Sequence, residues 1–289
     1  MGHRVLRHSS VDAFLEAAGA FLAEREAEHN LIFGICHQMR ATPELFADDP
    51  VELLTVVDER DRVIGASLRT PPQNPILSEL DDPSAVEALV DEFVTGDMPG
   101  VLGPKEHAAH FAERWSERTG QRAELAVAER IFRLDAVLPP RPTAGAWRVA
   151  ASGDRARAAG WLLDFVREAL PADELPEPEQ ADAAVGRWIE GIGRRLYVWE
   201  VEGRIVSMVA AGGETPNGIR IGPVYTPPEE RGRGYGTALT AAVSQDQLDR
   251  GRRFCFLYTD LANPTSNRIY ASIGYRPVRD VDQYRFVDA

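Results

Sequence analysis

An arginine- and glycine-rich hexapeptide is the part of this sequence whose residue types point most directly to a chemistry. Residues 231–236 read Arg-Gly-Arg-Gly-Tyr-Gly, and they lie between a β-rich run at 219–226 and a helix-favouring run at 237–243. A glycine-rich turn that opens a helix presents unpaired backbone N–H groups and the positive end of the helix dipole, which suit a pyrophosphate. Arg231 and Arg233 add positive charge at the same place. The segment therefore predicts a phosphate-bearing cofactor.

Two common phosphate-binding motifs do not fit this segment. The dinucleotide fingerprint Gly-x-Gly-x-x-Gly, counted from Gly232, requires a glycine where the chain has Thr237. The Walker loop requires Gly-Lys, and the one lysine of the chain, Lys105, follows Pro104. The pattern that does fit is Arg-x-x-Gly-x-Gly between a strand and a helix.

A second segment supports the first. Residues 263–270 read Asn-Pro-Thr-Ser-Asn-Arg-Ile-Tyr. Together the two segments resemble the two core motifs of the GNAT superfamily of acetyl-CoA-dependent N-acetyltransferases, in the order in which that family has them. The second family motif is Asn-x-x-Ala-x-x-Leu-Tyr, from which this chain departs mildly with Ser266 and Ile269. The resemblance covers residues 197–286 and is weak or absent before about residue 145.

The resemblance implies that acetyl-CoA is the cosubstrate. It implies that backbone groups at the end of one strand pair with the pantetheine arm, and that the arginine–glycine loop holds the pyrophosphate. A splayed strand would give the arm a free edge, in the manner of strand addition. Asn263 can contact the cofactor or cap the helix that Pro264 begins, and the two roles are compatible. The cofactor-binding residues implied in this way are Val224, Tyr225, Thr226, Arg231, Gly232, Arg233, Gly234, Tyr235, Gly236, Thr237, Asn263 and Asn267.

Tyr270 is the candidate general acid, because it occupies the tyrosine position of the second motif. Acetyl transfer to an amine requires a bound cofactor, a deprotonated amine and a proton for the leaving thiolate. A phenol with a pKa around 10 is protonated at neutral pH and can supply that proton. The alternative is that Tyr270 is a core tyrosine on the buried face of a short helix.

The general base is not identified by the sequence. Residues 144–289 contain no histidine, which removes the commonest base from that half. Glu214 and Asp260 are candidates because each lies near the end of an expected strand, and either could act through a water molecule. In the other half, His107 and His110 can share one helix face, but a metal site needs more ligands than these two. We therefore expect no metal and assign both histidines to an exposed helix.

Composition places the chain among soluble globular proteins. Its 289 residues are 44% hydrophobic and 27% charged, and no run of eighteen apolar residues exists. No apolar segment of signal length follows residues 1–8, and two cysteines, Cys36 and Cys255, do not make a disulfide framework. We expect a cytoplasmic protein in which both cysteines are reduced core residues.

The net charge of −13 argues against general nucleic-acid binding, which relies on lysine and arginine. Arginines do gather between residues 231 and 268, where an anionic cofactor is expected. An acidic stretch at 173–179 could attract a cationic amine, or it could be a solvated loop. The expected partner is a small-molecule amine, with no membrane and no nucleic acid. The sequence indicates no oligomeric state.

A proline-rich stretch at 137–145 separates two halves of ordinary domain size. After it, strand and helix patterns follow in the order ββ, βα, βα, β, which is the layout of a GNAT core. The first half resembles a worn copy of the second, because 53–58 and 62–67 match the strand pair near 197–208. It has no arginine–glycine loop, and 99–104 is expected to form a turn.

We therefore predict an α/β (α+β) fold with two GNAT-like domains, each a mixed, mostly antiparallel sheet flanked by helices. Residues 1–143 form a degenerate N-terminal domain, and residues 144–289 form the catalytic domain, with a splayed parallel strand pair at its cofactor site. The expected function is transfer of an acetyl (acyl) group from acetyl-CoA to a small-molecule amine by direct attack. The alternatives are a protein or peptide N-acetyltransferase and a binding module that senses acyl-CoA without turnover. Tandem architecture also occurs in enzymes that acetylate cysteinyl glycosides, which is an analogy of layout only.

Overall fold

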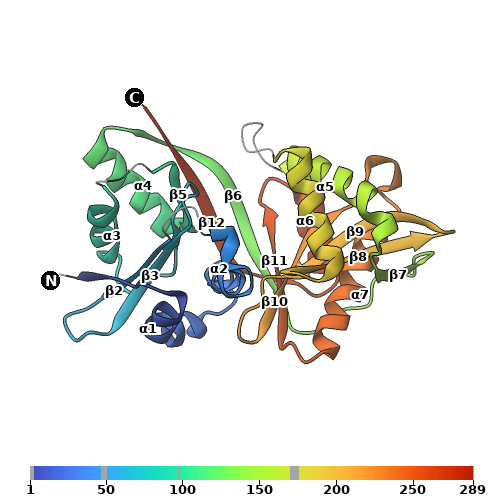
Figure 1. Cartoon of the computed structure of the whole chain (residues 1–289), viewed down its shortest axis with the longest axis horizontal. Coiled ribbons are helices and arrows are strands. Elements are labelled where there is room, and N and C mark those ends of the chain that lie inside the picture. The colour runs from blue at the N-terminus through green and yellow to red at the C-terminus, as the bar shows by residue number, and fades with distance from the viewer. Residues whose placement is uncertain (1–2, 47–50, 95, 97, 170–175, 289) are drawn as a thin grey trace. The chain divides into compact units, whose positions relative to one another are not determined.

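The chain divides into two compact units in the computed structural model, which describes residues 3–46, 51–94, 96, 98–169 and 176–288. Unit 1 comprises residues 1–131 and 278–289, and unit 2 comprises residues 132–277. The described residues form eight α-helices and mostly antiparallel strands with some parallel pairs (Figure 1). The predicted α/β fold class is therefore confirmed. The domain boundary expected between residues 143 and 144 stays a prediction.

Unit 1 is built from seven strands and four α-helices within the described ranges. Its elements are β1 Arg4–Arg7, α1 Val11–Glu24, α2 Asn30–Ala41, β2 Glu52–Val57, β3 Val63–Arg69, β4 Ile76–Leu77, α3 Ala85–Phe93, β5 Gly100–Pro104, α4 Lys105–Thr119, β6 Arg122–Leu134 and β12 Arg276–Val287. The strands follow the spatial order β1, β2, β3, β4, β5, β12, β6. The predicted hairpin at 53–67 is present as β2 and β3.

Both faces of β2 and β3 are covered, because their side chains alternate between two pairs of helices. Leu53 and its partner Leu68 belong to the apolar cluster of α1 and α2, whereas Leu54 belongs to the cluster of α3 and α4. Ile64 joins the latter cluster at a register shift between the two strands, which interrupts the alternation in β3. A strand that is buried on both faces reads in the sequence as a continuous apolar run.

The turn expected at 99–104 is instead strand β5. This strand pairs antiparallel with residues 281–285 of β12. Its first glycine permits close packing, since a Cβ at Gly100 would lie 1.9 Å from the carbonyl oxygen of Tyr284. Glycine and proline are strong turn signals in a sequence, but here they mark a place where two strands approach closely.

The closing strand expected near 284–287 exists as part of β12, and it completes the sheet of unit 1. Likewise, β6 begins in unit 1, and its last residues, 132–134, belong to unit 2. The pattern of a strand predicts its presence, but the neighbour with which it pairs depends on residues far away in the chain.

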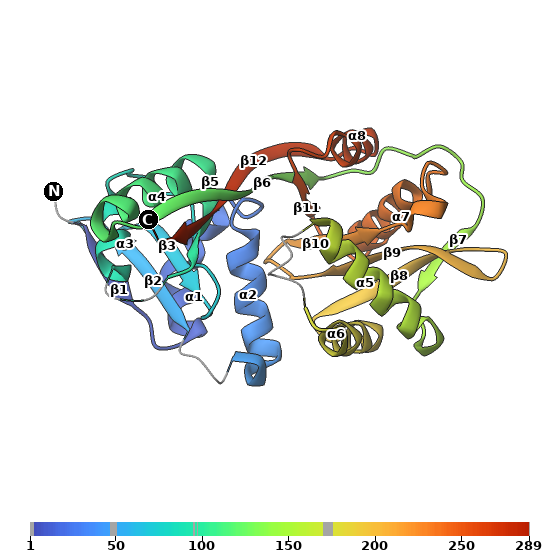
Figure 2. The same ribbon diagram turned by 90° about the horizontal axis from the view of Figure 1, so that it is seen from above.

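Whereas the predicted closing strand lies in unit 1, unit 2 contains the predicted order of elements ββ, βα and βα. Its elements are β7 Ala146–Val149, α5 Arg155–Ala169, α6 Pro178–Glu190, β8 Arg194–Val201, β9 Arg204–Gly212, β10 Gly218–Tyr225, α7 Tyr235–Asp249, β11 Phe254–Asp260 and α8 Pro264–Ser272, with the end of β6 and the start of β12. The strands follow the order β6, β11, β10, β9, β8, β7. Helices α5 and α6 pack on one face of this sheet and α7 on the other (Figure 2).

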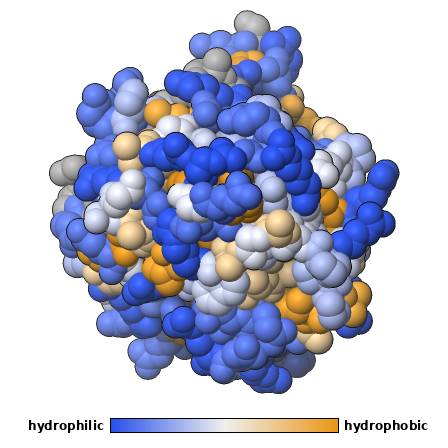
Figure 3. Space-filling view, turned by 90° about the vertical axis from the view of Figure 1, so that its right-hand side faces the viewer, coloured by the Kyte–Doolittle hydropathy of each residue, from blue (hydrophilic) through white to orange (hydrophobic). Residues whose placement is uncertain are grey.

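The face of the molecule shown in Figure 3 is mostly hydrophilic, with apolar residues in small separate groups. Trp147 of β7 is one of the exposed large apolar side chains, with an exposed fraction of 36%. Single exposed apolar residues are common on protein surfaces. None of the described helices has both the length and the apolar character that crossing a bilayer requires.

Candidate functional site

Strands β10 and β11 pair in parallel only at their beginning. The pairing joins residues 218–220 to residues 254–256. Beyond this point no pairing between the two strands occurs among the described residues, although β10 continues to Tyr225 and β11 to Asp260. The strands therefore splay, as predicted, and the second half of β10 has an edge that β11 does not occupy.

A bulge separates the part of β10 that pairs with β11 from the part that does not. Ile221 pairs with Ala211 of β9, and the next pair joins Val224 to Val209. Both Ile221 and Val224 pack in the apolar cluster of α7, although they are three positions apart. Since side chains alternate along a regular strand, one extra residue is inserted at 222–223.

The arginine–glycine loop enters α7 with several N–H groups left without an acceptor. Gly232 and Gly234 have φ angles of 78° and 84°, in the left-handed region that favours glycine. The N–H of Ala238 makes the first helical bond, to the carbonyl of Gly234. Within the described part of the chain, the N–H groups of residues 232–237 donate to no backbone or side-chain group. They lie at the positive end of α7 and suit an anion.

The first turn of α7 packs directly against the end of β10. A Cβ at Gly236 would lie 2.9 Å from Oγ1 of Thr226. That oxygen is 2.9 Å from Oγ of Ser207, whose hydroxyl donates to the carbonyl of Tyr225 at 3.0 Å. The loop and the strand end are thus brought together. Ser207 could not be predicted from the sequence, because a serine within a buried strand carries no motif.

Both arginines of the loop are bound to carboxylates. Nη2 of Arg231 lies 2.8 Å from each carboxylate oxygen of Glu168, and its Nε donates to the carbonyl of Thr226 at 2.8 Å. Nη1 of Arg233 donates to Glu230 at 3.0 Å. These side chains fix the shape of the loop, so that the backbone N–H groups are its free donors. Glu168 is also a partner that the sequence did not reveal, because it lies 63 residues away.

Asn263 and Asn267 fasten the start of α8. Oδ1 of Asn263 accepts from the N–H of Ser266 at 3.0 Å, which is the expected helix cap. The Asn267 amide donates to the carbonyls of Asp260 at 3.2 Å and Asn263 at 2.9 Å, and the hydroxyl of Thr259 donates to its Oδ1. The side chain of Asn267 therefore ties α8 to the end of β11.

Tyr270 lies on α8 and is half-buried against the apolar cluster of α7. Its ring meets that of Tyr275 edge to face, with the centroids 6.0 Å apart. Within the described residues its hydroxyl makes no hydrogen bond. Burial raises the pKa of Tyr270 to about 12, so the phenol is protonated at neutral pH. Tyr270 thus has the packing contact of the alternative role together with a hydroxyl that no described residue engages.

The two candidate bases have structural partners. Oε2 of Glu214 lies 2.5 Å from Nη2 of Arg252. Oδ1 of Asp260 accepts from the N–H of Ala262 at 2.7 Å, which closes the turn after β11. Neither carboxylate is singled out as the base.

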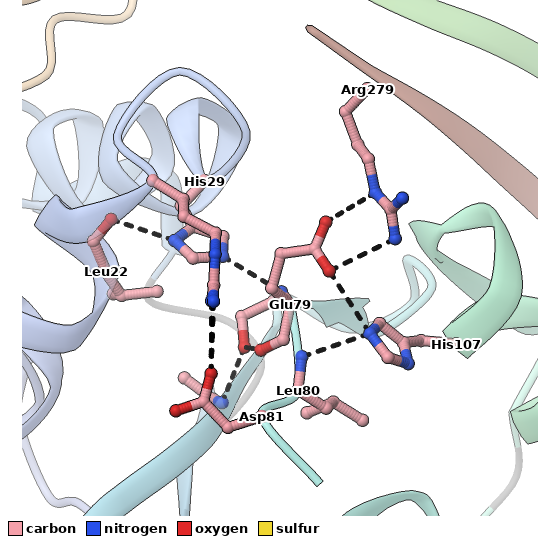
Figure 4. Close-up of polar contacts among 10 residues, drawn as sticks. Leu22, His29, Glu79, Leu80, Asp81, His107 and Arg279 are labelled. Atoms are coloured by element: carbon pink, nitrogen blue, oxygen red, sulfur yellow. Dashed lines mark hydrogen bonds and ion pairs between the residues drawn. The ribbon is translucent and has the colours of Figure 1, made fainter. Parts of the chain in front are cut away.

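His107 belongs to a polar network in unit 1 (Figure 4). Its Nε2 lies 3.2 Å from both the backbone nitrogen of Leu80 and Oε2 of Glu79, and Glu79 also forms an ion pair with Arg279 of β12. The expectation of an exposed histidine is wrong here, because the His107 side chain is only 13% exposed. No group of three or more potential metal-ligand side chains gathers among the residues that the structure describes.

Comparison of the sequence with protein families matches residues 162–275 to the acetyltransferase (GNAT) family. A search among curated proteins finds no match.

Solved structures with a similar fold extend over nearly the whole chain. A Drosophila protein is 14% identical with a TM-score of 0.70, and the alignment covers 99% of each chain. A tandem GNAT protein from the clavulanic acid biosynthesis pathway is 14% identical with a TM-score of 0.56, over 99% of this chain and 98% of that one. A GCN5-related N-acetyltransferase from Sphaerobacter thermophilus is 18% identical with a TM-score of 0.55, over 87% of this chain and 91% of that one. At such identities the likeness concerns the fold alone.

Proposed function

Because residues 162–275 form a domain of the acetyltransferase (GNAT) family, we propose that the chain transfers the acetyl group of acetyl-CoA to an amine of a small molecule. Family membership supports acyl transfer in general. The observation that carries the finer proposal is the junction of two features in unit 2. The free edge of β10 adjoins a loop whose N–H groups at 232–237 have no acceptor among the described residues.

The chain's own groups suit the two ends of acetyl-CoA. Backbone groups of 224–226 would pair with the amides of the pantetheine arm, which can add to the free edge of β10 like a strand. Residues 231–237 would hold the pyrophosphate through their N–H groups and the dipole of α7. The lack of a side chain at Gly236 keeps the loop against β10. Asn263 and Asn267 would act by fixing α8.

Acetyl-CoA supplies an activated thioester, which the amine attacks directly. Tyr270 would donate a proton to the departing sulfur, and its pKa of about 12 keeps the phenol protonated beforehand. In water a phenol is a weaker acid than a thiol. The donation therefore depends on the sulfur becoming negative in the same buried surroundings, where an anion is costly. Glu214 and Asp260 are the candidates that would receive the proton of the amine, through water.

The test combines binding and turnover on the full chain. Calorimetry measures the affinity for acetyl-CoA, and thiol release follows turnover across a mixed library of amines that includes peptides. We expect acetyl-CoA to bind and thiol release to depend on a small amine. Release with peptides alone would favour a protein or peptide N-acetyltransferase. Binding without release would favour a module that senses acyl-CoA, and absence of binding would contradict the assignment.

A further inference from the structure

Two arginines lie side by side on the sheet face of unit 2 that packs against α5 and α6. Arg194 of β8 is opposite Gly212 of β9 in the strand register, and Gly212 is opposite Arg220 of β10. Residues that are directly opposite each other point to the same face of a sheet. On that face Leu196 and Met208 pack into the apolar cluster of α5 and α6.

The glycine between them allows the two side chains to approach each other. A Cβ at Gly212 would lie 2.5 Å from Cγ of Arg194. Nη1 of Arg194 reaches across β9 and donates to the carbonyl of Gly222, in the β10 bulge, at 2.5 Å. Burial, together with the nearby charge of Arg220, lowers the pKa of Arg194 to about 9, which still leaves it charged at neutral pH.

Each guanidinium also lies over an aromatic ring. The guanidinium carbon of Arg194 is 5.7 Å from the ring centroid of Trp188 in α6, and that of Arg220 is 4.6 Å from the ring centroid of Tyr258 in β11. Stacking of this kind orients a planar guanidinium and leaves the N–H donors at its edge available.

Neither arginine has a carboxylate partner among the described residues, in contrast to several other arginines of unit 2. Arg155, Arg231 and Arg252 each pair with an aspartate or glutamate. Two neighbouring cations that are partly withdrawn from water are costly unless an anion compensates them. An anion from outside the described residues would offset this cost.

We infer that Arg194 and Arg220 bind the carboxylate of the acceptor, which is an amino acid or another amine that carries a carboxylate. This inference rests on the proposed acetyl transfer. The pair adjoins the bulge of β10, directly before the free edge at 224–226 to which acetyl-CoA is assigned. A carboxylate matches the edge donors of guanidinium groups. A zwitterion also suits a molecule of net charge −13, because its ammonium group offsets the repulsion that a bare anion meets.

The test uses the full chain and pairs of acceptors that differ only in the carboxylate, namely L-amino acids and their primary amides. The wild type should have the higher kcat/KM for the amino acids. Arg220→Gln is the informative variant, because Arg194 also holds the bulge. For the variant, kcat/KM for amino acids should fall at least about tenfold through loss of a charged hydrogen bond. Its kcat/KM for amides and its KM for acetyl-CoA should stay within about twofold.

Arg195→Gln is the matched control. It removes the same charge from the next residue of β8, which is exposed and points to the opposite face of the sheet, since its partner Ala211 packs in the cluster of α7. Its ratio of amino-acid to amide turnover should equal that of the wild type.

Several outcomes would overturn the carboxylate site. They are equal turnover of acids and amides by the wild type, an equal loss on both in Arg220→Gln, and a preference for phosphorylated amines. Equal turnover of acids and amides by the wild type overturns the site even if the variant fails to fold. Acetyl-CoA binding without turnover of any acceptor also counts against the site, because the acceptors tested include the L-amino acids that the site should bind. Absence of acetyl-CoA binding by folded protein would instead contradict the proposed function itself.

Discussion

The ring of Tyr270 makes an apolar contact, and its hydroxyl is engaged by no described residue. A single substitution therefore separates the packing role from the proposed role as general acid. Tyr270→Phe keeps the contact with Tyr275 and removes only the oxygen. We expect thiol release to fall about a hundredfold or more, since general acid catalysis is worth that order. Acetyl-CoA affinity, measured by calorimetry, should stay within about twofold, because the binding groups are elsewhere.

A different pattern would identify Tyr270 as a core residue. In that case Tyr270→Phe would lower the melting temperature and weaken acetyl-CoA binding together. Unchanged turnover would mean that the thiolate leaves unassisted or that another group protonates it.

Gly234 is the second residue at which the proposed site is open to a direct test. Gly234→Asp places a carboxylate beside the N–H groups of the loop, where the pyrophosphate is assigned. Acetyl-CoA affinity should fall at least about tenfold, or roughly 1.4 kcal/mol. Calorimetry on folded protein provides the measurement.

The control for this change is Gly203→Asp, in the turn between β8 and β9. Gly203 has a φ angle of 76°, close to the 84° of Gly234, and a Cβ there meets no atom within 4 Å. The two variants therefore share the conformational cost of a left-handed aspartate. Equal acetyl-CoA affinity in both would contradict the loop assignment.

Residues that form a contiguous motif could be predicted from the sequence, whereas their partners could not. The loop at 231–237 and the cap at Asn263 were both found in this way. Glu168 and the Arg194–Arg220 pair were missed, because no local pattern marks an ion partner in another helix or a side chain opposite in a sheet. Such contacts depend on strand register, which long-range packing decides.

At the scale of elements, the order of strands and helices in unit 2 could be predicted because each carries its own periodicity. The splayed ends of β10 and β11 followed from the resemblance. The strand β5 could not be predicted, since its glycines and prolines signal a turn locally. The pairing of β12 with β5 could not be predicted either, because strand register depends on long-range packing.

Glu79 contacts His107 of α4 and Arg279 of β12, and these contacts predict a pH-dependent contribution to stability. Burial raises the pKa of Glu79, but the hydrogen bond with His107 and the charge of Arg279 outweigh it, and the net pKa is lowered. A carboxylate whose pKa is lowered by folding stabilises the folded state at pH values above its pKa in the unfolded chain. This stabilisation is lost as the pH falls through its pKa in the folded protein. Glu79→Gln should therefore lower the free energy of unfolding by about 1–3 kcal/mol at neutral pH. The difference from the wild type should shrink below about pH 4.

Denaturant titrations at neutral pH and near pH 3 provide the measurement. Glu124→Gln is the control, because this carboxylate pairs with Arg122 at 38% exposure, compared with 14% for Glu79. An exposed pair contributes little, so the control should resemble the wild type at both pH values. A difference for Glu79→Gln that grows in acid would contradict the assigned role.

At the scale of the whole molecule, the compact unit 2 begins at residue 132, within β6. Phe132 and Leu134 are buried in the apolar cluster of α7, and the N–H of Leu138 donates to the carbonyl of Ile273 at 2.9 Å. A fragment of residues 144–289 lacks these groups and also carries the end of β12 without β5. It should be less soluble than a fragment of residues 132–277. Its unfolding free energy should be lower by roughly 3–6 kcal/mol for the two lost apolar side chains.

Size-exclusion chromatography and thermal melting of the two fragments make the comparison. Fragments of equal solubility and equal melting temperature would show that residues 132–143 are dispensable for unit 2. Full activity of residues 144–289 alone would further show that the N-terminal half is an independent module.

The place of β12 in unit 1 also bears on how the protein is made. The chain leaves unit 1 after Ile131, and residues 278–289 return to it only after the 146 residues from 132 to 277 have been synthesised. At about 5–20 residues per second, translation of that stretch takes roughly 7–30 seconds. During this time the edge of β5 that will bind β12 has no partner in the nascent chain, and an open edge attracts other strands. Unit 1 is synthesised first and completed last, so a chaperone that shields this edge on the ribosome should raise the yield of native protein.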